Sequence, residues 1–147
     1  METTPTITPQ LEKVREYLAE EGFRPRIEKD DLFLTYRGWT VVVTNDCDDT
    51  SYYYVLVPFF WEIESNAERL QALETASEMS RLYKVTKLFL TADNANVSAM
   101  TGAFATTPEA FCDVVVRCIS ITAAAVEEFR KTMNDRSKAA APPAPDA

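Results

Sequence analysis

The residues best suited to chemistry in this sequence are its three cysteines and the acidic run from Asp46 to Asp49. The run, Asp-Cys-Asp-Asp, is similar to the start of a calcium-binding loop, but such a loop needs a glycine at its sixth position and an acid at its twelfth. This chain has Ser51 and Val57 there. Cys112 and Cys118 lie six residues apart, which on a helix is about 240° around the axis. They cannot chelate one ion together, so we expect no metal site and interpret the acidic run as a solvated turn.

Catalytic motifs are also missing from the sequence. The chain contains no histidine, which is the commonest catalytic base and metal ligand. Nucleophilic Ser-His and Cys-His arrangements are therefore excluded. The glycines Gly22, Gly38 and Gly102 lie far apart, so they form no glycine-rich phosphate loop. We expect no catalytic residue, no cofactor and no nucleotide site.

Composition limits the class of protein and its partners. The 147 residues are 46% hydrophobic and 26% charged, which is typical of one folded domain. The net charge of −8 repels nucleic acid and anionic lipid, so we expect neither as a partner. Residues 1–10 have neither the basic nor the apolar part of a signal peptide, and no apolar run reaches the roughly 18 residues of a membrane span. The odd number of cysteines without a Cys-x-x-Cys pair also favours a cytoplasmic protein.

The elements that must position any site are predicted from periodicity and capping signals. Thr8 and Pro9 are expected to start a first helix that ends at Gly22. Asp30-Asp31 is expected to form the first turn, and Pro58 to stop a strand. The order is helix (8–22), strands (23–29, 32–36, 39–44, 52–57), helix (65–83), strands (85–91, 97–104) and helix (107–133).

This order predicts an α+β fold of the type α-β-β-β(-β)-α-β-β-α, with an antiparallel sheet packed by helices. The number of strands before the second helix, three or four, stays open. We expect one domain over residues 7–133. Residues 1–6 are expected to be a disordered leader, and residues 134–147 a disordered tail rich in alanine and proline.

The last predicted helix carries more apolar surface than one packing face needs. Two interpretations stay open for the additional surface. The chain itself covers it, with the second helix or with residues 59–61, or it is an interface with another subunit or a target protein. This second apolar flank consists of Cys112, Val116, Ile119 and Ala123. Our first choice of contact residues is Val116, Ile119 and Ala123.

A further candidate surface is the aromatic stretch over residues 52–61. Alternation along a strand places Tyr52 and Tyr54 on one face and Tyr53 on the other. Core packing accounts for such side chains, yet a sheet with aromatic residues on both faces needs a cover on both, either a helix or another chain. Tyr53, Phe60 and Trp61 are our second choice of contact residues.

Several short segments together carry a recognisable pattern of hydrophobic residues and turns. They are Tyr17 to Phe23, Asp30 to Leu34 with Gly38, Leu82 to Leu90, the turn from Asp93 to Asn96, and Thr107 to Phe111. Over about residues 10–133 the chain resembles the YbjN-like family, whose fold is that of type III secretion chaperones. The resemblance implies a protein without established enzymatic activity. Family members are described as regulators of bacterial sensory transduction, and the chaperone relatives are small, acidic and usually dimeric.

We therefore expect a non-enzymatic protein-binding module with a regulatory role, which forms a homodimer and binds a protein partner. The first alternative is a type III secretion-type chaperone that holds a partner protein. The second alternative is a small-ligand binder or an enzyme that uses a pocket of tyrosines and carboxylates.

Overall fold

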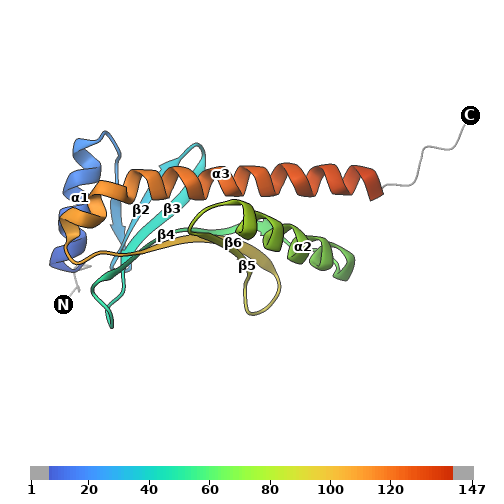
Figure 1. The fold of residues 1–147 in the computed structure, drawn as a ribbon, viewed down its shortest axis with the longest axis horizontal. Coiled ribbons are helices and arrows are strands. Elements are labelled where there is room, and N and C mark those ends of the chain that lie inside the picture. The colour runs from blue at the N-terminus through green and yellow to red at the C-terminus, as the bar shows by residue number, and fades with distance from the viewer. Residues whose placement is uncertain (1–6, 141–147) are drawn as a thin grey trace, which may run out of the picture.

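A computed structural model describes residues 7–140 of the chain. The expected leader, residues 1–6, and residues 141–147 of the expected tail lie outside the described residues. Within them, three helices lie on one side of a six-stranded sheet (Figure 1). The elements are α1 (Pro9–Glu20), β1 (Arg26–Glu28), β2 (Asp31–Tyr36), β3 (Trp39–Asn45), β4 (Tyr52–Glu62), α2 (Asn66–Leu82), β5 (Thr86–Leu90), β6 (Asn96–Phe104) and α3 (Pro108–Ala140).

The sheet has the strand order β1-β2-β3-β4-β6-β5, and every neighbouring pair is antiparallel. The predicted α+β fold class is confirmed, with four strands before α2. The first four strands form a meander. β6 then pairs with β4, and β5 pairs with β6 and forms the outer edge of the sheet. Among the described residues, no helix is long and apolar enough to cross a membrane.

Local sequence signals explain where the first two helices begin. The Thr8 side chain accepts a hydrogen bond from the Leu11 backbone N–H at 3.0 Å, so it caps α1. The Ser65 hydroxyl likewise accepts the N–H of Glu68 at 3.1 Å and caps α2. The Glu68 carboxylate does not bond back to this cap. It accepts the indole N–H of Trp61 at 2.8 Å, which ties the start of α2 to β4.

Two predicted boundaries are wrong. The first turn consists of Lys29 and Asp30, both with positive φ, as a two-residue hairpin turn requires. Asp31 already pairs with Glu28, one residue earlier than predicted. Pro58 does not end β4, because a shift of register between Val57 and Trp61 places it in an irregularity where the strand needs no N–H from it.

The last helix is longer than predicted. α3 continues to Ala140, seven residues beyond Met133, so residues 134–140 are helical rather than part of a disordered tail. Packing against α2 explains the extension, because Arg136 forms ion pairs with Glu74 at 3.4 Å and with Glu78 at 3.1 Å. These contacts compensate for the lack of a sheet beneath this end of α3.

The core lies between the sheet and the helices. α3 crosses the sheet over β4 and β6, with α1 beside its first half and α2 beside its second half (Figure 1). The largest fully buried side chains come from all three helices and from the helix-facing side of β2, β3 and β4, and include Leu11, Leu18, Leu32, Leu34, Val41, Tyr53, Met79, Phe111, Ile119 and Phe129.

Both edges of the sheet are protected against pairing with another strand. At one edge, α2 lies along β5, and the Ser80 hydroxyl accepts the outward-facing N–H of Leu88 at 2.9 Å. At the other edge, β1 has only three residues, two of which form the Arg26–Glu28 ion pair at 2.8 Å. Association through a sheet edge is therefore disfavoured.

Candidate functional site: the open face of the sheet

The second flank of α3 is covered by the chain itself, so it is not an available interface. Ile119 and Ala123 have 0% exposure, and Val116 is partly buried against the core. The flank lies toward α1 and the β2–β3 hairpin rather than toward α2. At its first end Lys13 of α1 pairs with Glu109 at 2.9 Å, and at its other end Arg37 of the hairpin pairs with Glu127 at 3.7 Å.

The chain itself therefore covers this flank, as the first interpretation predicted. The covering elements are α1 and the β2–β3 hairpin, however, and not the second helix or residues 59–61. Ile119 and Ala123 are therefore corrected from contact residues to core residues. The physical reason is that α1 folds back over α3, a contact between residues about a hundred positions apart that periodicity within one helix cannot reveal.

The second choice of contact residues also packs inward. Tyr53 is 1% exposed and stacks on Phe111 with ring centroids 4.5 Å apart. Burial raises the pKa of its phenol. Phe60 and Trp61 are half-buried and both meet Phe129 edge-on, with centroids 5.2 and 5.8 Å apart. These side chains stabilise the contact between β4 and α3, and Tyr53 is corrected to a core residue.

The side of the sheet that faces away from the helices is left uncovered by the described elements. Because Tyr53 points to α3, its neighbours Tyr52 and Tyr54 point the opposite way. Cross-strand partners such as Phe104, opposite Tyr52, share this orientation. We call this surface the open face; its apolar members are Phe33, Tyr52, Tyr54, Leu56, Phe89, Met100 and Phe104, and Val42 lies buried among them.

One end of the open face is an aromatic cluster. The ring of Tyr52 lies 5.6 Å from that of Tyr54 and 5.2 Å from that of Phe104, between centroids. Gly102 lies beneath Tyr52, and a Cβ on that glycine would be 2.8 Å from Cε2 of the tyrosine. Phe104 is 78% exposed, the most exposed large apolar side chain among the described residues. This cluster presents aromatic surface to solvent on a rigid support.

The other end of the open face is polar and carries charges of both signs. The Thr44 hydroxyl donates to Asp31 Oδ1 at 2.5 Å. The Arg26 guanidinium lies 5.8 Å from the centre of the Phe33 ring, a cation–π contact. Tyr54 lies between the two ends of the open face. Burial raises the pKa of its phenol, and the negative charge of Asp31 raises it further by a smaller amount. Protein interfaces likewise combine aromatic surface with adjacent polar groups.

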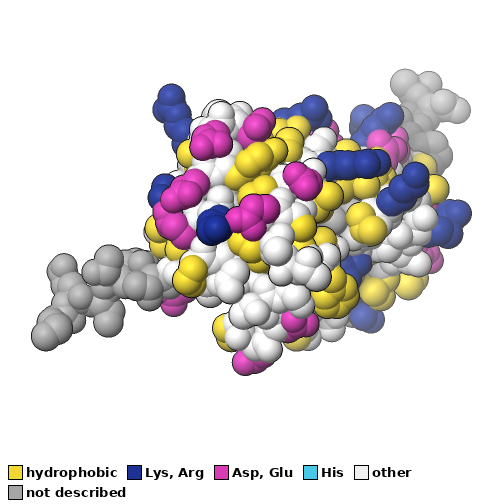
Figure 2. All heavy atoms as spheres, turned by 60° about the vertical axis from the view of Figure 1, so that its left-hand side comes forward, with side chains coloured by type: hydrophobic (Ala, Val, Ile, Leu, Met, Phe, Trp, Pro, Cys, Tyr) yellow, Lys and Arg dark blue, Asp and Glu magenta, His cyan; other side chains and the backbone are white. Residues whose placement is uncertain are grey.

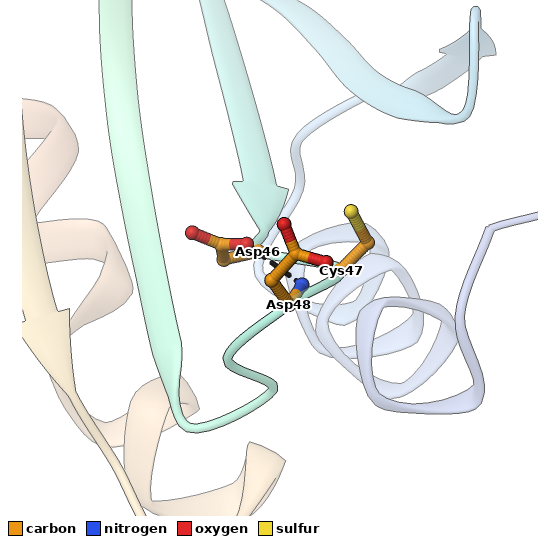
Figure 3. Close-up of side chains that lie close together, drawn as sticks. All are labelled: Asp46, Cys47 and Asp48. Carbon is orange, nitrogen blue, oxygen red and sulfur yellow. Dashed lines mark hydrogen bonds between the residues drawn. The ribbon is translucent and has the colours of Figure 1, made fainter.

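The acidic run forms a tight turn at the end of β3 (Figure 3). The possible ligand atoms of Asp46, Cys47 and Asp48 lie within 4.8 Å of one another. The Asp46 carboxylate, however, already accepts the backbone N–H of Asp48 at 2.8 Å. Cys47 and Asp48 are exposed. The proximity of these groups therefore follows from an Asx turn.

The charges of the surface are unevenly distributed. At the end of the molecule that carries α1, hydrophobic side chains lie between charged ones (Figure 2). A depression there is bordered by the carboxylates of Glu16, Glu20, Glu109 and Asp113. At the β1–β2 end of the open face, by contrast, the carboxylates of Glu28 and Asp31 are hydrogen-bonded to Arg26 and Thr44, respectively.

The sequence predicted the alternation of Tyr52, Tyr53 and Tyr54 correctly, but not which face remains open. It also missed Phe104, which contributes most to the exposed aromatic surface. The alternation of side chains along residues 97–104 could have indicated it. Alternation places Met100, Gly102 and Phe104 on one side of the strand, and the pairing with β4 shows that this side belongs to the open face.

Comparison with known proteins supports the fold. The structure is similar to that of YbjN, a proposed transcription regulator from E. coli, with a TM-score of 0.63 and 14% identity over 86% of this chain and 96% of that one. It is also similar to an uncharacterized protein from Methanothermobacter thermautotrophicus, with a TM-score of 0.60 and 11% identity over 86% of this chain and 98% of that one. No protein-family model and no curated protein matches the sequence. The chain therefore has a YbjN-like fold.

Proposed function

We propose that this chain is a non-enzymatic regulatory module that acts through protein–protein contacts, and that it forms a homodimer through its open face. The observation that carries the proposal is the exposed aromatic cluster around Phe104 on a sheet covered from one side only. A large apolar surface of this kind marks an interaction site in a folded protein. Its rigid backbone would preserve the shape needed for a specific partner.

A second copy of the chain is the occupant that the geometry favours. Edge-to-edge association is disfavoured, because α2 covers β5 and β1 is short and charged. A face-to-face dimer avoids both edges. The same patch then lies on both sides of a two-fold axis, and the charges of both signs at its margin can face each other.

The test is the mass of the purified protein in solution, measured by light scattering during size-exclusion chromatography. We expect twice the 16.6 kDa of one chain. Phe104→Asp should yield the monomer, because it places an unpaired charge in an apolar contact. Leu70→Asp is the matched control: Leu70 is also exposed, at 59%, but lies on α2. A monomeric wild type, or a Phe104→Asp variant that remains dimeric, would refute the open-face dimer.

The regulatory role requires a second measurement. Tagged wild type, Phe104→Asp and Leu70→Asp are compared for the proteins that co-purify at near-equal stoichiometry. A regulator of transcription or signalling among them supports the proposal. A secreted protein held in its place would favour the chaperone alternative. Conversion of an added metabolite by the pure protein would contradict a non-enzymatic role.

A further inference from the structure

A separate pocket lies on the helix-covered side of the sheet, between α3 and the adjacent ends of β5 and β6. Its volume is about 310 Å³, near the lower limit of the roughly 300 to 1,000 Å³ that small-molecule sites occupy. It faces away from the open face, because the side chains of Ala103 and of α3 line it. We call it the α3 pocket; the side chains that define it are Val85, Ala103, Val114, Ile121, Lys84 and Arg117.

The pocket exists because β5 is shorter than β6. β5 begins at Thr86, opposite Thr101, whereas β6 continues to Phe104. The small side chain of Ala103 leaves the space between this end of β6 and α3 unfilled. Val85 turns the chain away from β6 with a φ of 54°, a conformation that strains a β-branched residue. Its side chain is 72% exposed at the pocket mouth.

The charge of the pocket is opposite to that of the molecule. The chain has 23 acidic and 15 basic residues, yet the lining contains Lys84 and Arg117 and no carboxylate. Neither cation belongs to an ion pair among the described residues. Arg117 also affects Cys118, which lines the pocket. Burial raises the pKa of the Cys118 thiol overall, and the positive charge of Arg117 opposes this with a smaller lowering effect.

We propose that the α3 pocket binds a small carboxylic acid with an apolar body, of the kind represented by a medium-chain fatty acid. The body lies against Val114, Ile121 and Ala103, and the carboxylate pairs with Arg117 and Lys84. An apolar wall provides the burial, while two unpaired cations select the anion. This inference goes beyond the proposed function and does not depend on it.

The probe is octanoate, titrated into the full-length protein by calorimetry, with methyl NMR spectra to locate the site. 1-Octanol and octylamine have the same body with a neutral and a cationic head, respectively. We expect one octanoate per chain, with at least tenfold weaker binding of both analogues. The methyl resonances of Val114 and Ile121 should shift, while those of Leu70 should not.

Three variants test the assignment. Arg117→Met keeps an apolar stem and should weaken octanoate binding about tenfold. Val114→Trp should abolish binding by filling the pocket; Val114 is 39% exposed, so the core tolerates the change. Arg24→Met removes an exposed arginine between α1 and β1 and should change the affinity less than twofold. Each variant is first shown to have wild-type chemical shifts outside the pocket.

Several results would overturn the proposal. They are the absence of saturable binding at millimolar octanoate, equal affinity for octanol, wild-type affinity in Arg117→Met, or methyl shifts confined to the open face. The last result would assign the ligand to the surface of the proposed dimer instead. Because Phe104 does not line the α3 pocket, octanoate binding by Phe104→Asp separates this inference from the failure of the dimer.

Discussion

At the scale of single residues, three buried threonines form a chain of hydrogen bonds across the core. Oγ1 of Thr101 lies 2.8 Å from that of Thr86 and 2.6 Å from that of Thr122. The Thr122 hydroxyl donates to the Cys118 carbonyl at 2.6 Å. Since each hydroxyl has one proton, Thr122 must accept from Thr101, and Thr101 from Thr86, whose proton the Lys84 carbonyl at 3.1 Å also attracts. This series of hydrogen bonds connects β5, β6 and α3, and each hydroxyl in it donates toward α3.

Thr101→Val should therefore destabilise the fold more than Thr86→Val. Valine keeps the shape of threonine, but at position 101 it breaks both bonds of the chain, at a cost of about 1–2 kcal/mol. After Thr86→Val, Thr101 can still donate to Thr122, so that variant is the matched control. Urea unfolding measures both free energies. An equal or larger loss in Thr86→Val would contradict the central role of Thr101 among these bonds.

At the scale of elements, α2 owes its position to the edge of β5. The Ser80 hydroxyl accepts the Leu88 N–H at 2.9 Å and lies 3.4 Å from the carbonyl of the same residue. A side chain from a helix thus replaces the missing neighbouring strand. This contact protects the edge and fixes α2 beside α3.

Ser80→Ala should expose this edge. The Leu88 N–H would lose its partner, so we expect a loss of about 1–2 kcal/mol and faster hydrogen exchange at the Leu88 amide. Ser77→Ala makes the same substitution at an exposed site of α2, so it controls for helix propensity. If both variants exchange alike at Leu88, Ser80 does not protect the edge.

The elements also show what could be predicted from sequence. Local signals fixed the starts of α1 and α2, because Thr8 and Ser65 bond to N–H groups three residues away. The course of β4 past Pro58 could not be predicted, since it depends on β6: the Phe59 N–H donates to the Ser98 hydroxyl at 3.0 Å. Residue patterns identify elements, whereas distant contacts decide where some of them end.

The same limit applied to the candidate site. The apolar flank of α3 looked surplus because its cover, α1 and the β2–β3 hairpin, lies far away in the sequence. Conversely, Tyr52 and Tyr54 resembled core residues, and only the layer arrangement shows that no described helix covers them (Figure 1). Burial is a property of the assembled layers rather than of one segment.

At the scale of the whole molecule, the described residues share one core, so we expect a single cooperative unfolding transition. The two tryptophans report on it from different strands. Trp39 meets Phe60 edge-on with centroids 6.3 Å apart, and Phe60 and Trp61 both meet Phe129 of α3. Any separation of the helices from the sheet would disrupt this cluster and change the tryptophan emission.

Tryptophan fluorescence and far-ultraviolet circular dichroism should therefore give the same urea midpoint and slope. Phe129→Ala should lower both midpoints together, with a loss of about 3–5 kcal/mol, because it leaves a cavity beneath the aromatic cluster. Lys131→Ala, an exposed neighbour on the same helix, should leave both curves nearly unchanged. Two separated transitions would instead show that the end of α3, which α2 holds through Arg136, unfolds independently of the sheet.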